Sequence, residues 1–288
     1  MKKILILLAF LLLTGCGKNS LPENTDKENT EKVEITEENK DIIPLIPLEE
    51  ATIPLIPLTK ATSDIPFYHL RVEPPKEVVA TEEKTIYLTF DDGPSDRTIE
   101  VLDILKEYDI KATFFVTCQQ EIQTEEKYTN ILKRIVEEGH TIGVHTYSHN
   151  YKDIYSSVDS FLKDFEMISD HILKHTGVTP NIFRFAGGSR NSFNKDTAQD
   201  IIDEMTSRGY VYYDWNVSAE DAVGKVTEQQ VINNIIQTMG KKTRAFVLMH
   251  DSEYMISTVN ALNDIIQYGI NQNYKFDKIT NQTKPVKF

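Results

Sequence analysis

Cysteine is scarce in this chain: Cys16 and Cys118 are its only two among 288 residues, so no framework of disulfides can hold the fold together. Positive charge is also in deficit, because 31 Lys and Arg stand against 44 Asp and Glu, a net charge of −13. This argues against nucleic acid or an anionic membrane as the ligand, since no basic surplus exists to neutralise phosphate. The longest apolar run, residues 4–13, would span about half of a bilayer core as a helix and is too short to cross a membrane.

The N-terminus has the composition of a bacterial export signal. Two lysines and the short apolar run precede Leu13-Thr14-Gly15-Cys16, which resembles the lipobox of bacterial lipoproteins. We expect residues 1–15 to be a cleaved signal peptide and Cys16 to be lipidated. That would anchor the protein to the outer face of the cell membrane, facing the cell wall, with Cys16 as its one contact with the membrane. An ordinary secretory signal with an incidental cysteine is the alternative.

Residues 16–80 are predicted to form an acidic, proline-containing stalk ahead of a folded domain over 81–288. The stalk is rich in Glu, Asn, Thr, Asp and Lys, and it cannot bury enough apolar surface to offset chain entropy, so we expect it to be disordered. It contains the repeat Ile-Pro-Leu-Ile-Pro-Leu at 43–48 and 53–58, where regular proline favours extended geometry. About forty residues of coil would reach roughly 40 Å from a membrane surface.

From about residue 81, short strands alternate with amphipathic helices some six times. This alternation implies parallel strands with covering helices, either as a closed (β/α) barrel or as an open doubly wound sheet. In both, ligands bind at the carboxyl ends of the strands. The predicted strands are 85–88, 111–117, 141–144, 181–185, 210–217 and 244–249.

Polar side chains follow most of these strands directly. Five polar sets at one edge are hard to explain as scattered surface residues, and they indicate a site there. The sets are Asp91-Asp92, His145 with His149, Arg184, Glu220-Asp221 and His250-Asp251.

The first two sets suggest a metal site. Adjacent carboxylates such as Asp91 and Asp92 repel each other unless a cation lies near, although an Asp-rich turn would show the same pair. His145 and His149 are four residues apart, so in a helical turn their rings would share one side. Two imidazoles and one carboxylate suit zinc with open positions for water and substrate.

Four motifs in order resemble those of the polysaccharide deacetylases, the NodB-homology domain. They are Thr-Phe-Asp-Asp-Gly at 89–93, His-Thr-Tyr-Ser-His at 145–149, Arg-Phe-Ala-Gly-Gly at 184–188 and Leu-Met-His at 248–250. The resemblance covers about 84–278. It implies a distorted, TIM-like (β/α) barrel of seven or eight strands and metal-dependent removal of N-acetyl groups from a glycan polymer.

The same resemblance implies roles for single residues. One divalent metal would be held by three of them, with zinc the first choice and cobalt, nickel or manganese the alternatives; these ligands are Asp92, His145 and His149. Asp91 would be the general base, paired with Arg184. His250 would be the general acid, oriented by Asp221, and the Gly187 N–H would bind the oxyanion.

The chain departs from the family pattern at three positions. Ala186 stands where the family often has Pro, Gly187 where many members have Tyr, and Ala222 where many have a Trp that walls the pocket. The backbone N–H of Gly187 can still serve the oxyanion. Ala222 cannot supply the contact with substrate that such a Trp makes.

Other functions remain open at this point. A glycosidase also uses two carboxylates, but they must flank the scissile bond about 5 to 9.5 Å apart, and it has no use for two ligand histidines. A wall-binding protein that retains the fold and has weak catalysis is a second alternative. Within the family, chitin oligomers and acetylxylan compete with peptidoglycan N-acetylglucosamine, which a wall-facing location favours. We expect a monomer whose partner is the glycan polymer.

Overall fold

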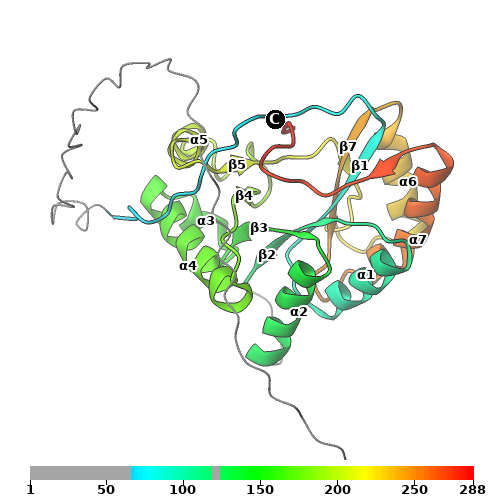
Figure 1. Cartoon of the computed structure of the whole chain (residues 1–288), viewed down its shortest axis with the longest axis horizontal. Coiled ribbons are helices and arrows are strands. Elements are labelled where there is room, and N and C mark those ends of the chain that lie inside the picture. The colour runs from blue at the N-terminus through cyan, green and yellow to red at the C-terminus, as the bar shows by residue number, and fades with distance from the viewer. Residues whose placement is uncertain (1–65, 119–123) are drawn as a thin grey trace, which may run out of the picture. The chain divides into compact units, whose positions relative to one another are not determined.

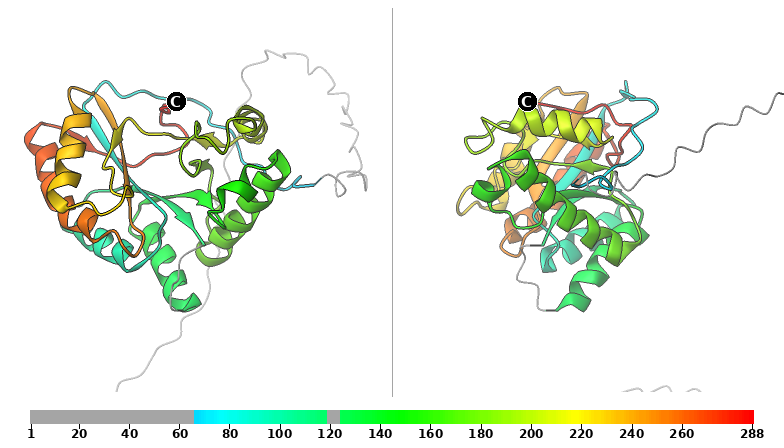
Figure 2. Two further views of the ribbon diagram at one scale, coloured as in Figure 1. Left: turned by 180° about the vertical axis from the view of Figure 1, so that it is seen from behind. Right: turned by 90° about the vertical axis from the view of Figure 1, so that its left-hand side faces the viewer.

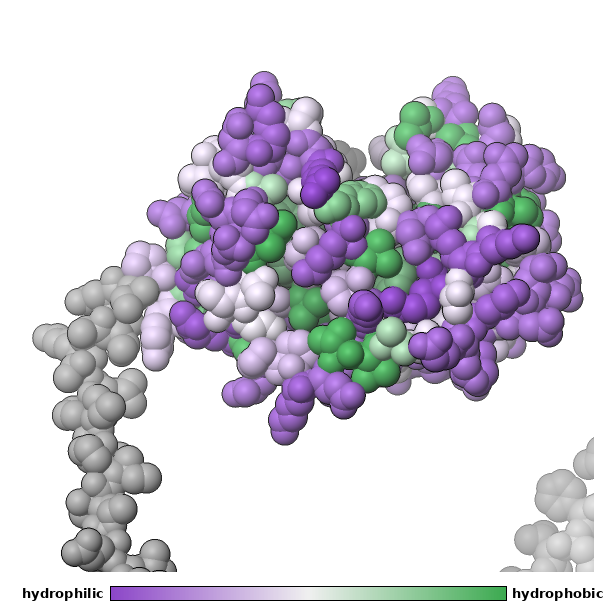
Figure 3. Space-filling model, turned by 90° about the horizontal axis from the view of Figure 1, so that it is seen from above, coloured by the Kyte–Doolittle hydropathy of each residue, from purple (hydrophilic) through white to green (hydrophobic). Residues whose placement is uncertain are grey.

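The computed structural model describes residues 66–118 and 124–288. The expected signal peptide over 1–15, the lipidation site Cys16 and the stalk up to residue 65 lie outside this described part. Within it, no helix is long and apolar enough to cross a membrane. Seen from above, the surface is largely hydrophilic, with hydrophobic residues in small separate patches (Figure 3).

Parallel strands form one curled sheet, and helices cover its outer face (Figures 1 and 2). The strand order is β5-β4-β3-β2-β1-β7-β6, with β8 beside the start of β1. The strands are β1 (Thr85–Asp91), β2 (Thr113–Thr117), β3 (Thr141–Thr146), β4 (Ile182–Phe183), β5 (Val211–Tyr212), β6 (Val217–Ser218), β7 (Arg244–His250) and β8 (Lys275–Phe276). The helices are α1 (Asp96–Glu107), α2 (Glu125–Glu137), α3 (Tyr151–Ile154), α4 (Val158–Thr176), α5 (Ala198–Ser207), α6 (Glu228–Met239) and α7 (Ile256–Asn271).

The predicted fold, an α/β protein with a distorted barrel, is confirmed. Every strand pairing in the described chain is parallel, as the alternation of strands and helices indicates. The distortion lies between β5 and β6, the two edges of the sheet, which no ladder joins among the described residues.

The stretch 210–217, predicted as one strand, is instead divided between these two edges. Two backbone carbonyls in its middle, those of Tyr213 and Asp214, accept hydrogen bonds from the Arg184 guanidinium at 2.9 and 3.2 Å. A side chain, in place of a neighbouring strand, therefore donates hydrogen bonds to these carbonyls. The chain between β5 and β6 thus crosses the open side of the barrel.

Strand β1 shows how the sheet separates its two faces. All seven of its residues are buried. Leu88 and Phe90 belong to the core beneath the helices, whereas Tyr87 belongs to a smaller cluster that includes Phe115 and Phe246. Because side chains alternate along a strand, Asp91 shares the face of Tyr87 and points into the barrel. A parallel barrel strand thus delivers a carboxylate to the interior at its carboxyl end.

The last part of the predicted stalk, residues 66–80, lies along the domain. Leu70 is buried, and the Val72 N–H donates to Arg208 O at 2.9 Å. A Cβ at Gly209 would lie 2.1 Å from Val72 O, and Gly209 has φ +92°, so only glycine allows this close approach.

Candidate active site

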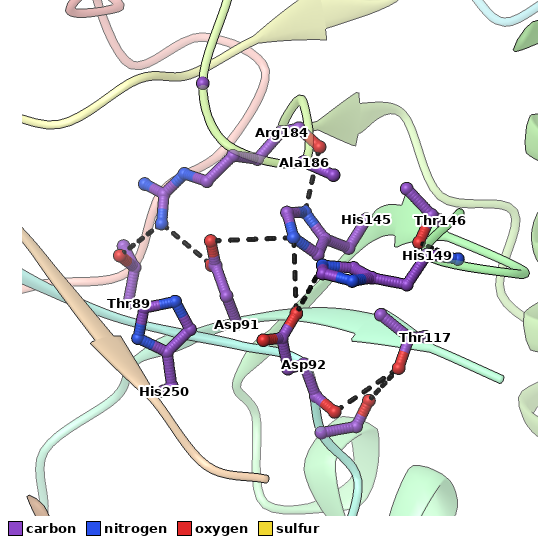
Figure 4. Close-up of polar contacts among 12 residues, drawn as sticks. Thr89, Asp91, Asp92, Thr117, His145, Thr146, His149, Arg184, Ala186 and His250 are labelled. Carbon is purple, nitrogen blue, oxygen red and sulfur yellow. Dashed lines mark hydrogen bonds and ion pairs between the residues drawn. The ribbon is translucent and has the colours of Figure 1, made fainter. Parts of the chain in front are cut away.

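The two adjacent acids after β1 point in different directions (Figure 4). Asp91 closes the strand and is 2 % exposed. Asp92 has φ +72°, in the left-handed region, and this turns its carboxylate away from that of Asp91. A capping box formed by Ser95 and Thr98 then starts α1. The local backbone thereby gives two neighbouring carboxylates separate environments.

Asp92 faces the two histidines of the second motif (Figure 4). Its Oδ1 lies 3.4 Å from His145 Nε2 and 3.2 Å from His149 Nε2. Burial raises the pKa of Asp92, but the hydrogen bond from His149 and the positive charge of His145 outweigh it, so the pKa lies below its usual range. Burial lowers the pKa of His145, which favours the neutral ring that a metal requires.

The two histidines do not lie on a helical turn, as their spacing had suggested. His145 is on β3, and His149 has φ +53° in the turn that follows. Asp164 on α4 shapes that turn, because its carboxylate accepts from the Tyr147 N–H at 2.7 Å, the Ser148 N–H at 2.9 Å and the Ser148 hydroxyl at 2.7 Å. Sequence reasoning missed Asp164, since a lone acid on an amphipathic helix is usually a solvated face residue.

Three ligand atoms, one each from Asp92, His145 and His149, lie within 4.8 Å of one another. The His145 Nδ1 lies 3.0 Å from Arg184 O, so this nitrogen carries the proton and Nε2 is left to face the cluster. Two imidazole nitrogens and a carboxylate oxygen, with a backbone carbonyl orienting one ring, fit a divalent metal such as zinc. Asp92, His145 and His149 therefore have the chemistry of a metal-binding site.

Arg184 is fully buried and ties the motifs together. Its guanidinium donates to Asp91 Oδ1 at 2.9 Å and to Thr89 Oγ1 at 2.7 Å (Figure 4). It also donates to the carbonyls of Tyr213 and Asp214, as described above. A buried ion pair contributes little net stability, but loss of one partner leaves an uncompensated charge that costs about 3–5 kcal/mol. Arg184 thus compensates the Asp91 charge and holds this carboxylate in one orientation.

His250 ends β7 directly beside Asp91, its register partner on β1. Its Nδ1 lies 2.8 Å from Asp221 Oδ1, and its backbone N–H donates to Asp221 Oδ2 at 2.8 Å. The Thr258 hydroxyl donates to the same Oδ2 at 2.7 Å. Burial lowers the pKa of His250, but the hydrogen bond to Asp221 and the negative charges of Asp221, Asp92 and Asp91 raise it to about 9. These carboxylates therefore favour the cationic form of His250.

The loop after β4 carries Gly187, which has φ +74°. The preceding carbonyl, Ala186 O, accepts from the Tyr155 hydroxyl at 2.9 Å and from Asn191 Nδ2 at 3.1 Å. These two bonds hold the loop at the carboxyl edge of the sheet. Ala222, which follows the His250 partner Asp221 in the sequence, is exposed.

Asp251, which follows β7, is a buried acid to which the family resemblance assigns no role. Its carboxylate accepts from the Thr98 hydroxyl at 2.6 Å and lies where a Cβ on Gly93 would be, 2.5 Å away. Its N–H donates to Asp91 O at 3.1 Å. Burial, with the negative charges of Asp92 and Asp91, raises the pKa of Asp251 to about 7. Asp251 joins the start of α1 to the turn that carries both acids.

The predicted site residues are thus brought together. Asp91, Asp92, His145, His149, Arg184 and His250 face one another at the carboxyl ends of β1, β3, β4 and β7 (Figure 4). An Asp-His-His cluster beside a second carboxylate and a cationic histidine is typical of hydrolases that use a metal at the ends of parallel strands.

Comparison with known proteins agrees with this class. The chain belongs to the polysaccharide deacetylase family, whose sequence model matches residues 78–210. It is 32% identical over 210 residues to the putative polysaccharide deacetylase YheN of Bacillus subtilis (strain 168), covering 71% of this chain and 70% of that protein. It is 28% identical over 235 residues to a peptidoglycan-N-acetylglucosamine deacetylase of Bacillus cereus, covering 78% of this chain and 81% of that protein.

A solved structure is also similar. The catalytic domain of the peptidoglycan N-acetylglucosamine deacetylase from Eubacterium rectale ATCC 33656 is 37% identical, with a TM-score of 0.68. The match covers 74% of this chain and 96% of that one. The chain is therefore an enzyme of the polysaccharide deacetylase family.

Proposed function

We propose that the chain removes N-acetyl groups from N-acetylglucosamine residues of peptidoglycan, with one divalent metal, zinc by the preference of its ligands, held by Asp92, His145 and His149. The observation that carries the proposal is the convergence of Asp92 Oδ1 with two imidazole Nε2 atoms at 3.4 and 3.2 Å. The peptidoglycan N-acetylglucosamine deacetylases among the relatives, at 28% and 37% identity, support the choice of substrate.

The residues around the cluster match the needs of amide hydrolysis. A divalent metal, when bound, supplies Lewis-acid polarisation of the acyl oxygen and lowers the pKa of a water molecule. Asp91 accepts a proton from the attacking water: its Oδ1 is held by Arg184, and its Oδ2 is the oxygen turned toward His145 Nε2, at 4.0 Å. The Gly187 N–H donates to the acyl oxygen as negative charge develops on it.

His250 completes the reaction by protonating the leaving amine, because an amide anion is too basic to depart alone. Its bond to Asp221 and its raised pKa keep the required proton on the ring at neutral pH. A glycan-binding protein without catalysis would not need Asp221 to keep a proton on His250. We therefore prefer the enzyme to the binding module, and a deacetylase to a glycosidase.

Acetate release tests this function. Purified protein is incubated with peptidoglycan, chitin oligomers and acetylxylan, and free acetate is measured together with the metal content of the same sample. We expect release from peptidoglycan, loss of release after chelation, and recovery when zinc is added back. Binding to peptidoglycan without acetate from any of the three glycans would overturn the proposal in favour of a binding module.

We further propose that lipidated Cys16 and the stalk over 16–80 present this site to the cell wall from the outer face of the membrane. The lipobox-like sequence supports the anchor. In a bacterial host, the full chain is expected in the membrane fraction with labelled fatty acid attached. Cys16→Ser is expected to carry no label and to be released into the medium, and equal labelling of both chains would contradict the anchor.

A further inference from the structure

We propose that the Tyr151 hydroxyl is a further catalytic group, which donates a hydrogen bond to the acyl oxygen alongside the Gly187 N–H. The inference rests on the proposed function, since it concerns the same reacting amide. Tyr151 lies outside the four sequence motifs. Its place in the fold, on the first turn of α3 just after the second histidine motif, carries the argument.

The Tyr151 ring packs against a proposed metal ligand. Its centroid lies 5.0 Å from that of His149, with the two planes at 52°. Phe193 lies edge-on at 5.3 Å, and Tyr155 lies at 6.2 Å. Aromatic neighbours on several sides hold the ring in one orientation, so its hydroxyl occupies a defined position.

The hydroxyl lies beside Gly187. A Cβ built at Gly187 would be 3.3 Å from Asn191 Nδ2, which already donates to Ala186 O and Gly188 O, 3.5 Å from Tyr151 Oη and 3.7 Å from Tyr151 Cε2. The phenol therefore reaches the space into which a side chain at position 187 would project. This brings an O–H group next to the backbone whose N–H we assign to the oxyanion, on the same side as His149.

The hydroxyl has no acceptor in the described part of the protein. Tyr155, one turn later, donates to Ala186 O at 2.9 Å, and Tyr213 reaches Thr280 O at 2.7 Å, whereas no hydrogen bond of Tyr151 Oη occurs among residues 66–118 and 124–288. A phenol at neutral pH carries one proton to donate. A half-buried donor without an acceptor among these residues, beside Gly187 and the His149 ring, is suited to a substrate oxygen.

Gly187 and Tyr151 thus act as a pair. Gly187 contributes its N–H and has no side chain. Tyr151, on α3, places its hydroxyl beside Gly187 as a second hydrogen-bond donor. A donor placed where charge develops lowers the barrier of the chemical step more than it strengthens substrate binding. Such a donor therefore affects kcat and leaves KM nearly unchanged.

Tyr151→Phe tests this role, because the variant keeps the ring against His149 and removes only the hydroxyl. We expect kcat for acetate release to fall about 10²-fold, with KM within about twofold of wild type and unchanged metal content. The matched control is Tyr68→Phe, which removes the hydroxyl of an exposed tyrosine in the segment before β1. This control is expected to retain wild-type kcat.

Each other result overturns the inference. A kcat within twofold of wild type would show that the hydroxyl does not contact the reacting group. A raised KM with unchanged kcat would show ground-state binding only, and lost metal would show a packing role. Absence of acetate release from the wild type would instead refute the proposed function itself, and this arm is measured first so that the two failures are distinguished.

Discussion

An Asp92→Ala variant is expected to lose bound metal and to lose acetate release by more than about 10³-fold while it stays folded. Asp92 supplies the only carboxylate among the three converging atoms, and its Oδ1 lies within 3.4 Å of both imidazole nitrogens. Metal catalysis is worth several kcal/mol of transition-state stabilisation, which corresponds to a loss of this size. Metal analysis of the purified variant and its rate on peptidoglycan measure both effects.

The left-handed backbone conformation of Asp92 disfavours alanine, so the Asp92→Ala variant requires a matched control. Asp92 has φ +72°, which costs an alanine about 1 kcal/mol, and Asp109 in the exposed turn after α1 has φ +51°. Asp109→Ala therefore repeats the strain far from the site and is expected to keep metal and activity. Asp92→Asn, which tolerates the left-handed region, is expected to match wild type in stability and to have little activity. Full turnover by Asp92→Ala would remove the basis of the metal site.

The positions of the main site residues could be predicted from the sequence because parallel strands share one carboxyl edge. A polar residue that directly follows such a strand must lie at that edge, whatever the loop does afterwards. Asp91 and His250 each end a strand, Arg184 follows β4 directly, and His145 is the last residue but one of β3. The pattern of the strands therefore predicted a site before any contact was known.

The remaining features depend on contacts between distant segments. His149 reaches the cluster through a left-handed turn shaped by Asp164, and this acid lies on a helix where periodicity predicts only a solvated face. The Tyr151 hydroxyl likewise lies beside Gly187, which is 36 residues later in the sequence. Spacing along the chain contains no signal for such pairs. Asp164 could be found only if related sequences had an acid at the same position of this helix.

The division of 210–217 into β5 and β6 has the same origin. Six of its eight residues are valine, tyrosine or tryptophan, which favour a strand, and the other two are Asp214 and Asn216. Arg184 takes the carbonyls of Tyr213 and Asp214, and this interaction outweighs local propensity. The residue that compensates the Asp91 charge therefore also holds the barrel open beside the site.

The charge of His250 has consequences for stability as well as for catalysis. Its pKa is about 9 in the folded protein, against 6.5 for the free side chain. A raised pKa means that folding favours the protonated ring, so this stabilisation is complete below pH 6.5 and is lost as the pH rises through 9. A metal-free sample is expected to lose unfolding free energy over that interval.

Asp221→Asn is expected to lower kcat most strongly on the alkaline side of its pH profile. The amide keeps the shape of Asp221 but removes the negative charge 2.8 Å from His250 Nδ1, so the pKa of His250 falls. At pH 9 a smaller fraction of His250 is then protonated, and kcat falls with that fraction. A bound dication would move both profiles toward lower pH but would leave the direction of the difference unchanged.

Glu220→Gln supplies the control for Asp221→Asn, because it removes a neighbouring charge from an exposed side chain. Its pH profile is expected to coincide with that of the wild type. The decisive measurement is kcat from pH 6 to 10 for the three proteins at saturating substrate. If the alkaline limb stayed in place in Asp221→Asn while kcat fell equally at every pH, Asp221 would orient the ring without tuning its charge. An unchanged profile with unchanged kcat would show that Asp221 neither orients His250 nor tunes its charge during catalysis.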